Sequence, residues 1–300
     1  MTTFRQVRLE DRGLITVGGP DRRAFLQGLI SNDVERAGPE RAIWAALLTA
    51  QGKYLHDFFI VELDSVLYLD CEAERLMDLG QRLSRFKLRA KIDLGIAEDY
   101  GVWVAYGSDA LPRAGLSADP GHAVGRAGGT LYCDPRVPAI GLRAILPKSS
   151  AAAVWHDLGA EPGDRQEYDR KRMMLGLPDG SRDMVVEKSI LLENNFDSLH
   201  GVDWNKGCYV GQELTARTKY RGLIKKRLMP VEIDGGTPEA GTPVVFDGRD
   251  AGEMRSAAGN VGLALLRLEP MEEALAEGRP LTAGGAHILP RRPDWDVTSC

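Results

Sequence analysis

The most informative segment of this 300-residue sequence reads Lys206-Gly207-Cys208-Tyr209-Val210-Gly211-Gln212-Glu213. Glycines on both sides of Cys208 allow the backbone to turn tightly and to approach a ligand closely. The ammonium of Lys206 favours the thiolate of a neighbouring cysteine, and the thiolate is the form that acts as a nucleophile or binds metal. Gln212 and Glu213 add an amide and a carboxylate within one turn. The segment therefore predicts a reactive thiol, although an isolated cysteine is often a small buried residue instead.

A run of basic residues follows this segment without an acidic residue among them: Arg217, Lys219, Arg221, Lys225, Lys226 and Arg227. In a chain whose formal net charge is -5, such a run forms a local positive patch. The patch suits a partner rich in carboxylates or phosphates, such as a polyglutamate tail or an RNA backbone. It can equally be a solvated face of the protein. The overall charge argues against direct nucleic-acid binding as a general property.

The other cysteines are Cys71, Cys133 and Cys300, which we interpret as structural or incidental. The cysteine spacing fits neither a zinc site nor a disulfide framework, and the five histidines are scattered, so we expect free thiols and no metal site. The start of the chain, residues 1–5, lacks the features of a signal peptide, and no apolar stretch is long enough to cross a bilayer. We therefore expect a cytoplasmic protein, or one of the mitochondrial matrix if the source is eukaryotic, without a membrane partner.

Hydrophobic periodicity predicts strands and helices that mix without regular βαβ alternation. We expect strands at 14–17, 58–63, 66–69, 91–94, 102–106 and 142–146, and helices at 76–86, 151–158 and 165–175. A further helix carrying Phe25, Leu26, Leu29 and Ile30 on one face is expected after Asp21, which can cap it. Asp64-Ser65 predicts a hairpin turn. This pattern favours the α+β class with mainly antiparallel sheets, and no dinucleotide or P-loop motif is present.

The pattern changes after about residue 226. Strands are expected at 228–233, 243–246 and 261–268, separated by Gly235-Gly236, Asp247-Gly248 and Gly259-Asn260. Short strands with glycine-rich turns are typical of a small β-barrel or sandwich. We therefore predict two regions, 1–226 and 227–300, and a loosely packed tail at 290–295.

The segment 206–213 resembles the signature K-G-C-Y/F-I/V-G-Q-E of the YgfZ family, relatives of the glycine-cleavage T-protein, an aminomethyltransferase. The resemblance continues through Leu214–Thr218 to Lys226-Arg227-Leu228. It also includes Phe25–Gly28, Gly52-Lys53, Leu192–Asn195 and Gly262-Leu263-Ala264, so it spans nearly the whole chain. The continuation after the signature is similar to the mitochondrial-type branch, which assists maturation of 4Fe–4S proteins. The bacterial branch is linked to tRNA methylthiolation through an iron–sulfur enzyme. The resemblance implies a T-protein-like cloverleaf of two intertwined antiparallel-sheet α+β subdomains plus a C-terminal β-barrel.

The same resemblance implies that tetrahydrofolate or a derivative binds in a central cavity. It assigns catalytic roles to Cys208 and Asp57. It assigns cofactor contacts to Asn32, Glu193, Lys206, Tyr209, Gln212, Glu213, Arg217 and Lys226. Two positions depart from the T-protein: its pair of adjacent acids reads His56-Asp57 here, and its folate-contacting glutamate falls at Met174. Methionine cannot accept a pterin hydrogen bond as a carboxylate does.

We therefore expect a folate-binding factor that assists iron–sulfur cluster assembly or repair, with Cys208 as the functional thiol. Its expected partners are folate and iron–sulfur proteins or their assembly machinery. One alternative is a folate-dependent one-carbon enzyme of the aminomethyltransferase type, which the two departures weaken. The other is a non-catalytic scaffold for iron–sulfur client proteins.

Overall fold

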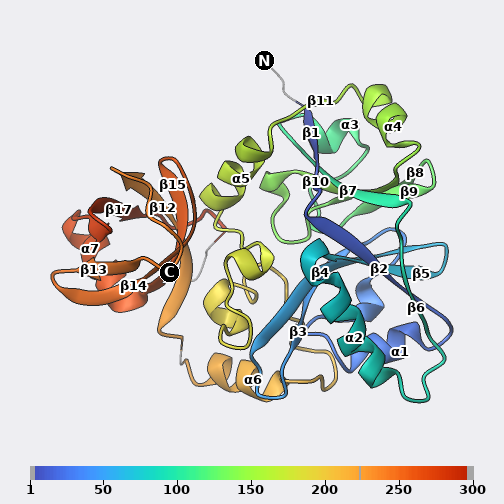
Figure 1. Ribbon diagram of the computed structural model, residues 1–300, viewed down its shortest axis with the longest axis horizontal. Coiled ribbons are helices and arrows are strands. Elements are labelled where there is room, and N and C mark those ends of the chain that lie inside the picture. The colour runs from blue at the N-terminus through green and yellow to red at the C-terminus, as the bar shows by residue number, and fades with distance from the viewer. Residues whose placement is uncertain (1–3, 223, 296–300) are drawn as a thin grey trace. The chain divides into compact units, whose positions relative to one another are not determined.

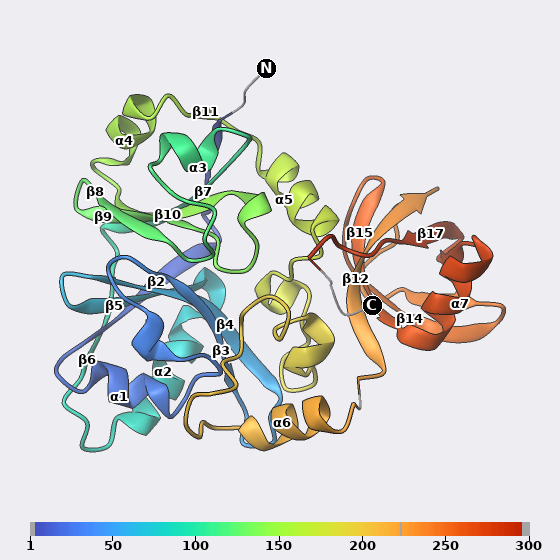
Figure 2. The same ribbon diagram turned by 180° about the vertical axis from the view of Figure 1, so that it is seen from behind.

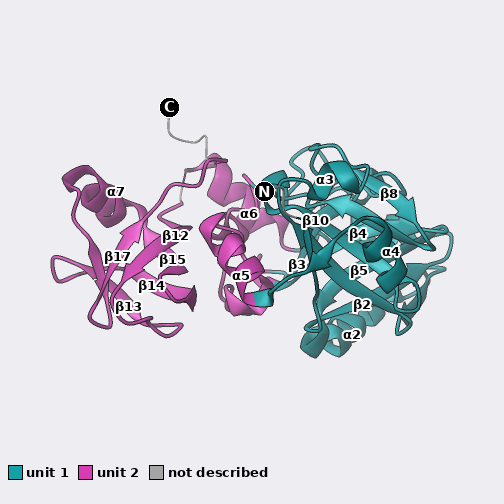
Figure 3. Cartoon of the chain, turned by 90° about the horizontal axis from the view of Figure 1, so that it is seen from above, with its two compact units in different colours: residues 1–50, 55–165, 199–210 teal, residues 51–54, 166–198, 211–300 magenta. Residues whose placement is uncertain are grey.

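The structure is a computed structural model that describes residues 4–222 and 224–295 (Figure 1). The chain forms two compact units. Unit 1 consists of residues 1–50, 55–165 and 199–210, and unit 2 of residues 51–54, 166–198 and 211–300 (Figure 3). Each unit is described below by itself, and the division into 1–226 and 227–300 stays a prediction.

Unit 1 contains a five-stranded sheet in the order β3-β4-β5-β2-β6. Its strands are β2 (Arg12–Gly18), β3 (Ile43–Leu48), β4 (Tyr54–Leu63), β5 (Val66–Glu72) and β6 (Asp93–Ile96). The predicted hairpin is confirmed, because Asp64 and Ser65 join β4 to β5 with φ angles of 48° and 64°. Two left-handed residues form the tight turn whose twist matches that of paired strands.

Two helices accompany this sheet, α1 (Arg22–Gln27) and α2 (Leu76–Lys87). The predicted amphipathic helix is confirmed in α2, which buries Leu79 and Leu83. The predicted cap of α1 is wrong, because the Asp21 side chain makes no cap hydrogen bond and instead accepts one from the backbone N–H of Lys91, 2.7 Å away. The helix is also shorter than expected, since it ends before Leu29 and Ile30, which are buried beyond it.

The second sheet of unit 1 has six strands in the order β11-β1-β7-β10-β9-β8 (Figure 2). Their bounds are β1 (Arg5–Arg8), β7 (Tyr100–Tyr106), β8 (Ala123–Arg126), β9 (Gly129–Cys133), β10 (Leu142–Pro147) and β11 (Glu161–Pro162). Side chains of α3 (Ala110–Arg113) and α4 (Ala151–Asp157) share one apolar core with this sheet, centred on Trp103 and Trp155. Among the described pairings of this sheet, the short one of β1 with β11 is parallel and the others are antiparallel. The predicted α+β class with mainly antiparallel sheets is confirmed.

A buried cluster of charges joins the two sheets of unit 1. Asp70 on β5 pairs with Arg12 on β2 at 2.6 Å and with Arg143 on β10 at 2.5 Å, and all three side chains are almost fully buried. The Arg143 guanidinium lies over the Phe59 ring, 3.9 Å from its centre. Buried charges are tolerated only when they are paired and hydrogen-bonded, so this cluster fixes one packing of the sheets.

Unit 2 combines a helical segment with a closed barrel in the order β12-β15-β14-β13-β16-β17. The helices are α5 (Arg165–Met174), a 3₁₀ helix (Leu191–Asn194), α6 (Gln212–Tyr220) and α7 (Leu268–Glu277). The barrel strands are β12 (Lys226–Asp234), β13 (Pro243–Phe246), β14 (Arg249–Ala258), β15 (Val261–Arg267), β16 (Leu281–Ala283) and β17 (Ala286–Pro290). The predicted C-terminal β-barrel is therefore confirmed.

The end of unit 2 is packed, so the prediction of a loose tail at 290–295 is wrong. Pro290 pairs with Val231 and helps to close the barrel, and Pro293 is buried. The indole N–H of Trp295 donates to the carbonyl oxygen of Leu175 at 2.7 Å. The described part of the chain holds no helix that is long and apolar enough to span a membrane.

Candidate functional site

Lys206, the first residue of the signature segment, has its side chain buried in unit 1. Its Nζ donates to the carbonyl oxygens of Ile30 and Asn32, at 2.7 Å each. Burial lowers the pKa of Lys206 to about 8, although the carboxylates of Asp33 and Asp203 oppose this change. The two carbonyl groups compensate the buried ammonium, which therefore anchors the signature to the loop that follows α1.

A second set of contacts anchors the residues after the cysteine. The Lys206 ammonium lies 5.2 Å from the centre of the buried Tyr209 ring, within range of a cation–π attraction. The backbone N–H of Val210 donates to the carbonyl oxygen of Gly28 at 3.1 Å. Gly211 then adopts a φ of 81° immediately before α6, a conformation that favours glycine.

Cys208 lies between these anchors and is exposed. Cys71 and Cys133 are buried instead, and burial raises the pKa of each thiol to about 12. A thiol with so high a pKa is inert at neutral pH, so the expectation that these two are structural agrees with their surroundings. Cys300 lies outside the described residues. Exposure excludes Cys208 as a core residue, while its chemical role and its activation by Lys206 stay predictions.

Asn32 is buried beside Lys206, and its side chain supports the backbone. Its amide Nδ2 donates to the carbonyl oxygens of Trp44 and His200, at 2.7 Å each, and its Oδ1 accepts from the Asp33 N–H. The structure thus brings Asn32, Lys206 and Tyr209 together in unit 1. Whether any of them contacts folate stays a prediction.

His56 and Asp57, which the sequence resemblance places at the acid pair of the T-protein, are buried on β4. Asp57 accepts a hydrogen bond from the indole N–H of Trp44 at 2.9 Å. His56 Nε2 lies 2.8 Å from Asp78 Oδ2, and burial, with a smaller contribution from Arg75, lowers the pKa of His56 to about 4. The neighbouring position therefore holds a neutral imidazole at physiological pH. The catalytic role of Asp57 stays a prediction.

Glu193 occupies an unusual electrostatic position in unit 2. It is half-buried, and burial raises the pKa of its carboxyl group, although Lys226, Lys53 and Arg255 each act to lower it. The structure thus brings the predicted residues Glu193 and Lys226 close enough for Lys226 to act on the Glu193 carboxyl group. Their contact with folate stays a prediction. The turn Gly52-Lys53 was part of the sequence resemblance, whereas Arg255 had no signal in the sequence.

Two buried polar atoms lie in residues of the same neighbourhood. Asn194 Oδ1 and Arg255 Nε have no hydrogen-bond partner among the described residues. Buried polar atoms are normally satisfied, so these two atoms, one in the residue after Glu193 and one in a side chain that acts on its pKa, are candidates for contact with a ligand.

The remaining predicted residues lie on or near α6. Glu213 and Arg217 are exposed on this helix and Gln212 is half-buried at its start. The basic run is not one patch, because Arg227 forms a two-pronged ion pair with Asp197 at 2.7 and 2.9 Å. Its exposed members are Arg217, Lys219, Arg221 and Lys225. Met174, which the sequence resemblance places at the T-protein glutamate, is exposed at the end of α5.

Among the described residues, no group of three or more His, Cys, Asp or Glu side chains is placed to hold a metal ion. The two groups of predicted site residues lie in different units: Asn32, Asp57, Lys206, Cys208 and Tyr209 in unit 1, and the others in unit 2.

Comparison with known proteins gives a consistent result for fold and family. The structure is similar to the glycine cleavage system aminomethyltransferase T from Bartonella henselae, with a TM-score of 0.76 over 96% of this chain and 84% of that chain. The sequence identity is 16%, so this likeness shows the fold alone. The family model for the C-terminal beta-barrel domain of CAF17 matches residues 225–297.

Sequence relatives carry more information. The mouse iron-sulfur cluster assembly factor IBA57, mitochondrial, is 34% identical over 97% of this chain and 85% of its own length. The human protein of the same name is 33% identical over 96% of this chain and 84% of its own length. A homologue from Pyricularia oryzae is 33% identical over 97% of this chain. The similarity to a mitochondrial-type branch is thus confirmed, while the narrower YgfZ assignment stays a prediction. The chain belongs to the IBA57 family.

Proposed function

We propose that this chain is a folate-binding factor that assists iron–sulfur cluster assembly or repair, with Cys208 as its functional thiol. The names of its relatives support the iron–sulfur part of this proposal. The observation that carries the role of Cys208 is its exposure between two anchored neighbours, Lys206 and Tyr209. A thiol held on a fixed backbone can be presented to a partner without the cost of ordering a loop.

The chemistry of a single cysteine defines how such a factor would handle a cluster. Iron–sulfur clusters take several thiolate ligands, so Cys208 can supply one and a partner protein must supply the others. The cluster is then cargo that passes between proteins, and the partners are iron–sulfur proteins or the machinery that assembles them. Methylthiotransferases that modify tRNA are one class of client with this chemistry. The mitochondrial names of the relatives favour the matrix for a eukaryotic source.

The residues around Glu193 fit a folate. A carboxyl group with a raised pKa can exchange hydrogen bonds with the amide and amino groups of a pterin ring. The unsatisfied atoms Asn194 Oδ1 and Arg255 Nε offer one acceptor and one donor to a ligand. Lys53 and Lys226 provide positive charge for the carboxylates of the glutamate moiety. Bound tetrahydrofolate would supply a carrier for one-carbon groups.

An aminomethyltransferase is the second candidate, because the fold is that of the T-protein. The local structure favours it less. Of the two adjacent acids expected in a T-protein, one is replaced by the buried, neutral His56. The other, Asp57, already accepts a hydrogen bond from the Trp44 indole. A reaction that needs a free carboxylate there would have to break this buried hydrogen bond.

The proposal is tested by replacing Cys208 with Ser in cells that lack the endogenous factor and measuring aconitase activity. We expect loss of aconitase activity with Cys208→Ser and normal activity with the matched control Cys71→Ala, because the Cys71 thiol is buried. Normal activity of Cys208→Ser would remove the thiol from the mechanism. If a pulldown of client proteins also survived this change, the scaffold alternative would replace the proposal.

Folate binding needs a separate measurement. Tetrahydrofolate is titrated calorimetrically into the wild type, Glu193→Gln and Lys226→Ala. We expect at least tenfold weaker binding for each variant, since each loses a hydrogen bond or a charge interaction worth about 1.4 kcal/mol or more. Equal affinity in all three proteins would contradict the assignment of this site.

A further inference from the structure

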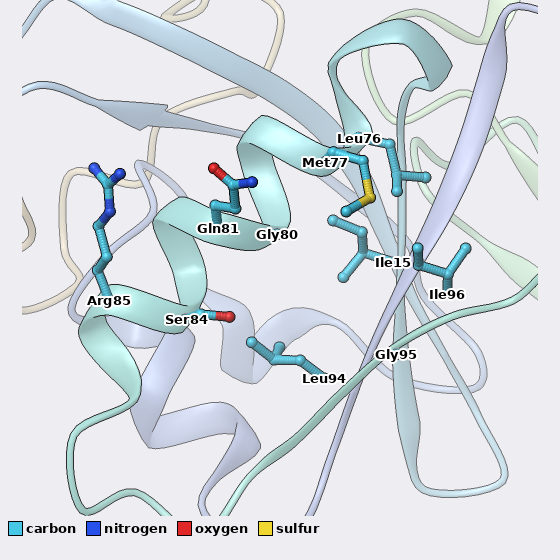
Figure 4. Close-up of a pocket in the computed structure, with 10 residues that line it drawn as sticks. All are labelled: Ile15, Leu76, Met77, Gly80, Gln81, Ser84, Arg85, Leu94, Gly95 and Ile96. Carbon is cyan, nitrogen blue, oxygen red and sulfur yellow. The ribbon is translucent and has the colours of Figure 1, made fainter.

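A groove of unit 1 that lies outside the predicted site is formed by α2 and β6. It has a volume of about 470 Å³. Its walls are mainly apolar, and Figure 4 shows Met77 on the helix facing Ile15 and Ile96 on the strands. Met77 and Ile96 are 61% and 48% exposed, which is high for large apolar side chains at one site.

The helix leaves room above the strands because its facing residues are small. Gly80 and Ser84 lie one turn apart on α2 and both line the groove. A Cβ placed on Gly80 would lie 3.8 Å from Ile15 Cδ1, which is ordinary contact, so packing does not require a glycine here. Glycine inside a helix costs about 1 kcal/mol relative to alanine. Alanine at position 80 would therefore fit and would stabilise the helix, yet the sequence has glycine there, which keeps the groove open.

The groove is bordered by an open sheet edge. β6 pairs with β2 and ends the sheet order, so no other described strand covers its far side. The Ala97 N–H donates to Leu14 O, and hydrogen-bonding directions alternate along an antiparallel strand. Gly95 therefore faces β2, while Leu94 and Ile96 present their N–H and C=O groups at the open edge. Such an edge is a template for another strand.

One end of this edge is strongly basic. Residues 85–96 contain four basic residues and one acid, Asp93. The four cations, Arg85, Lys87, Arg89 and Lys91, are exposed, and none has an ion-pair partner among the residues that the structure describes. Leu88 lies between them with 89% of its surface exposed. A second copy of this chain paired antiparallel at the same edge would place its own basic run at the opposite end of β6, so it would bring no negative charge to these cations, whereas an acidic partner segment would.

We propose that β6 and this groove bind an extended segment of a partner protein, apolar at alternating positions and acidic at the end that reaches residues 85–91. The segment adds a strand to β6 through the backbone groups of Leu94 and Ile96. Its apolar side chains enter the groove beside Met77 and Gly80. Its acidic residues meet the cations, so charge fixes the register and the orientation. This surface involves neither Cys208 nor Glu193.

Two fluorescent peptides test the proposal with the full-length protein. One begins with three glutamates followed by Val-Thr-Val-Thr-Val, and the other ends with the three glutamates, so they place the acids correctly for parallel and antiparallel addition to β6. A scrambled peptide of the same composition is the control. We expect one of the two to bind at least tenfold more tightly than the control, as measured by anisotropy. Equal binding of all three peptides would overturn the proposal.

Three variants locate the binding site. Gly80→Met fills the groove and should weaken binding tenfold or more, whereas Gly80→Ala should leave it unchanged. Ile96→Pro removes one outward N–H, leaves the bonds to β2 intact, and should weaken binding similarly. Thermal melting of each variant verifies that it is folded. Unchanged affinity in folded Gly80→Met and Ile96→Pro proteins would refute the site.

Charge is tested independently of the groove. The triple variant Lys87→Glu/Arg89→Glu/Lys91→Glu should lose most of the affinity, and the triple variant Lys87→Arg/Arg89→Lys/Lys91→Arg should retain it. Binding to the wild type should also weaken between 50 and about 500 mM salt, because exposed charges are screened. Equal affinity of both triple variants would refute the acidic character of the partner.

Discussion

The anchoring of the signature segment by Lys206 makes a quantitative prediction. Replacing Lys206 by Met keeps the length of the side chain but removes the ammonium. The change leaves the carbonyl oxygens of Ile30 and Asn32 without the donor that each has at 2.7 Å. We expect the variant to be less stable, in spite of the cost of burying the charge.

Two opposing free energies determine the size of the effect. Hydrogen bonds from a charged donor contribute about 1.5–3 kcal/mol each, so the pair contributes about 3–6 kcal/mol. Burial lowers the pKa of Lys206 from 10.5 to about 8. At about 1.36 kcal/mol per pH unit, this corresponds to a cost of about 3 kcal/mol. The net loss of unfolding free energy at pH 7 should therefore be at most about 3 kcal/mol.

The sign of the pH dependence follows from the same pKa. Between about pH 8 and 10.5 the unfolded state keeps the Lys206 proton and the folded state releases it, so rising pH stabilises the wild type. Lys206→Met lacks this group. The difference in stability between the wild type and the variant should thus widen above pH 8 and stay constant below it.

Urea unfolding followed by tryptophan fluorescence measures the difference. Trp44, Trp103, Trp155 and Trp204 all belong to unit 1, where Lys206 lies, so the signal reports mainly on that unit. With a urea slope of about 3 kcal/mol per molar, as expected for a chain of this size, the midpoint should fall by up to about 1 M. Lys91→Met, which removes an exposed lysine of the same unit, is the control and should change stability by less than about 0.5 kcal/mol. A Lys206→Met midpoint equal to that of the control at pH 7 and pH 9.5 would refute the reasoning.

Three further predictions concern other residues. Cys208→Ser should change the urea midpoint by less than the equivalent of about 0.5 kcal/mol, because the side chain is exposed, so any loss of function in this variant would not reflect unfolding. His56, with a pKa of about 4 in the folded state and 6.5 in the reference state, should cause stability to fall as the pH drops from 6.5 to 4, and urea midpoints of His56→Gln should fall less steeply. Arg172→Leu leaves the buried Asp183 without its cation at 2.6 Å and should cost about 3–5 kcal/mol, seen as a lower melting temperature by calorimetry; the double variant with Asp183→Asn should recover part of it.

Local elements were largely predictable because their signals lie within a few residues. The Asp64-Ser65 turn and the apolar periodicity of α2 each depend on neighbours in the sequence, and both are found in the structure. The capping role of Asp21 failed because the backbone N–H of Lys91, 70 residues away, took its carboxylate. A local preference is worth about 1 kcal/mol, and one tertiary hydrogen bond can override it.

The barrel also contains an element that local sequence preferences do not predict. Its glycine-rich turns and the strands β12, β13 and β15 were expected, but β14 was not, since the stretch Arg249–Ala258 has few residues that favour strands. Pairing with β13 and β15 makes it a strand, because closing a barrel removes every sheet edge. The packing of residues 290–295 was not predictable for a similar reason, because Trp295 meets its hydrogen-bond partner Leu175 only when the chain has folded.

The sequence by itself determined the α+β class, the C-terminal barrel, the family and the position of the signature around Cys208. These follow from periodicity, turn residues and a short motif, all of which are local. Only the tertiary structure decided that Lys206 is buried and Cys208 exposed, since Lys206 meets Ile30 across 176 positions of the chain. The pKa of Glu193 and the groove beside β6 likewise depend on residues brought together by folding, because burial and electrostatic surroundings are properties of packed space.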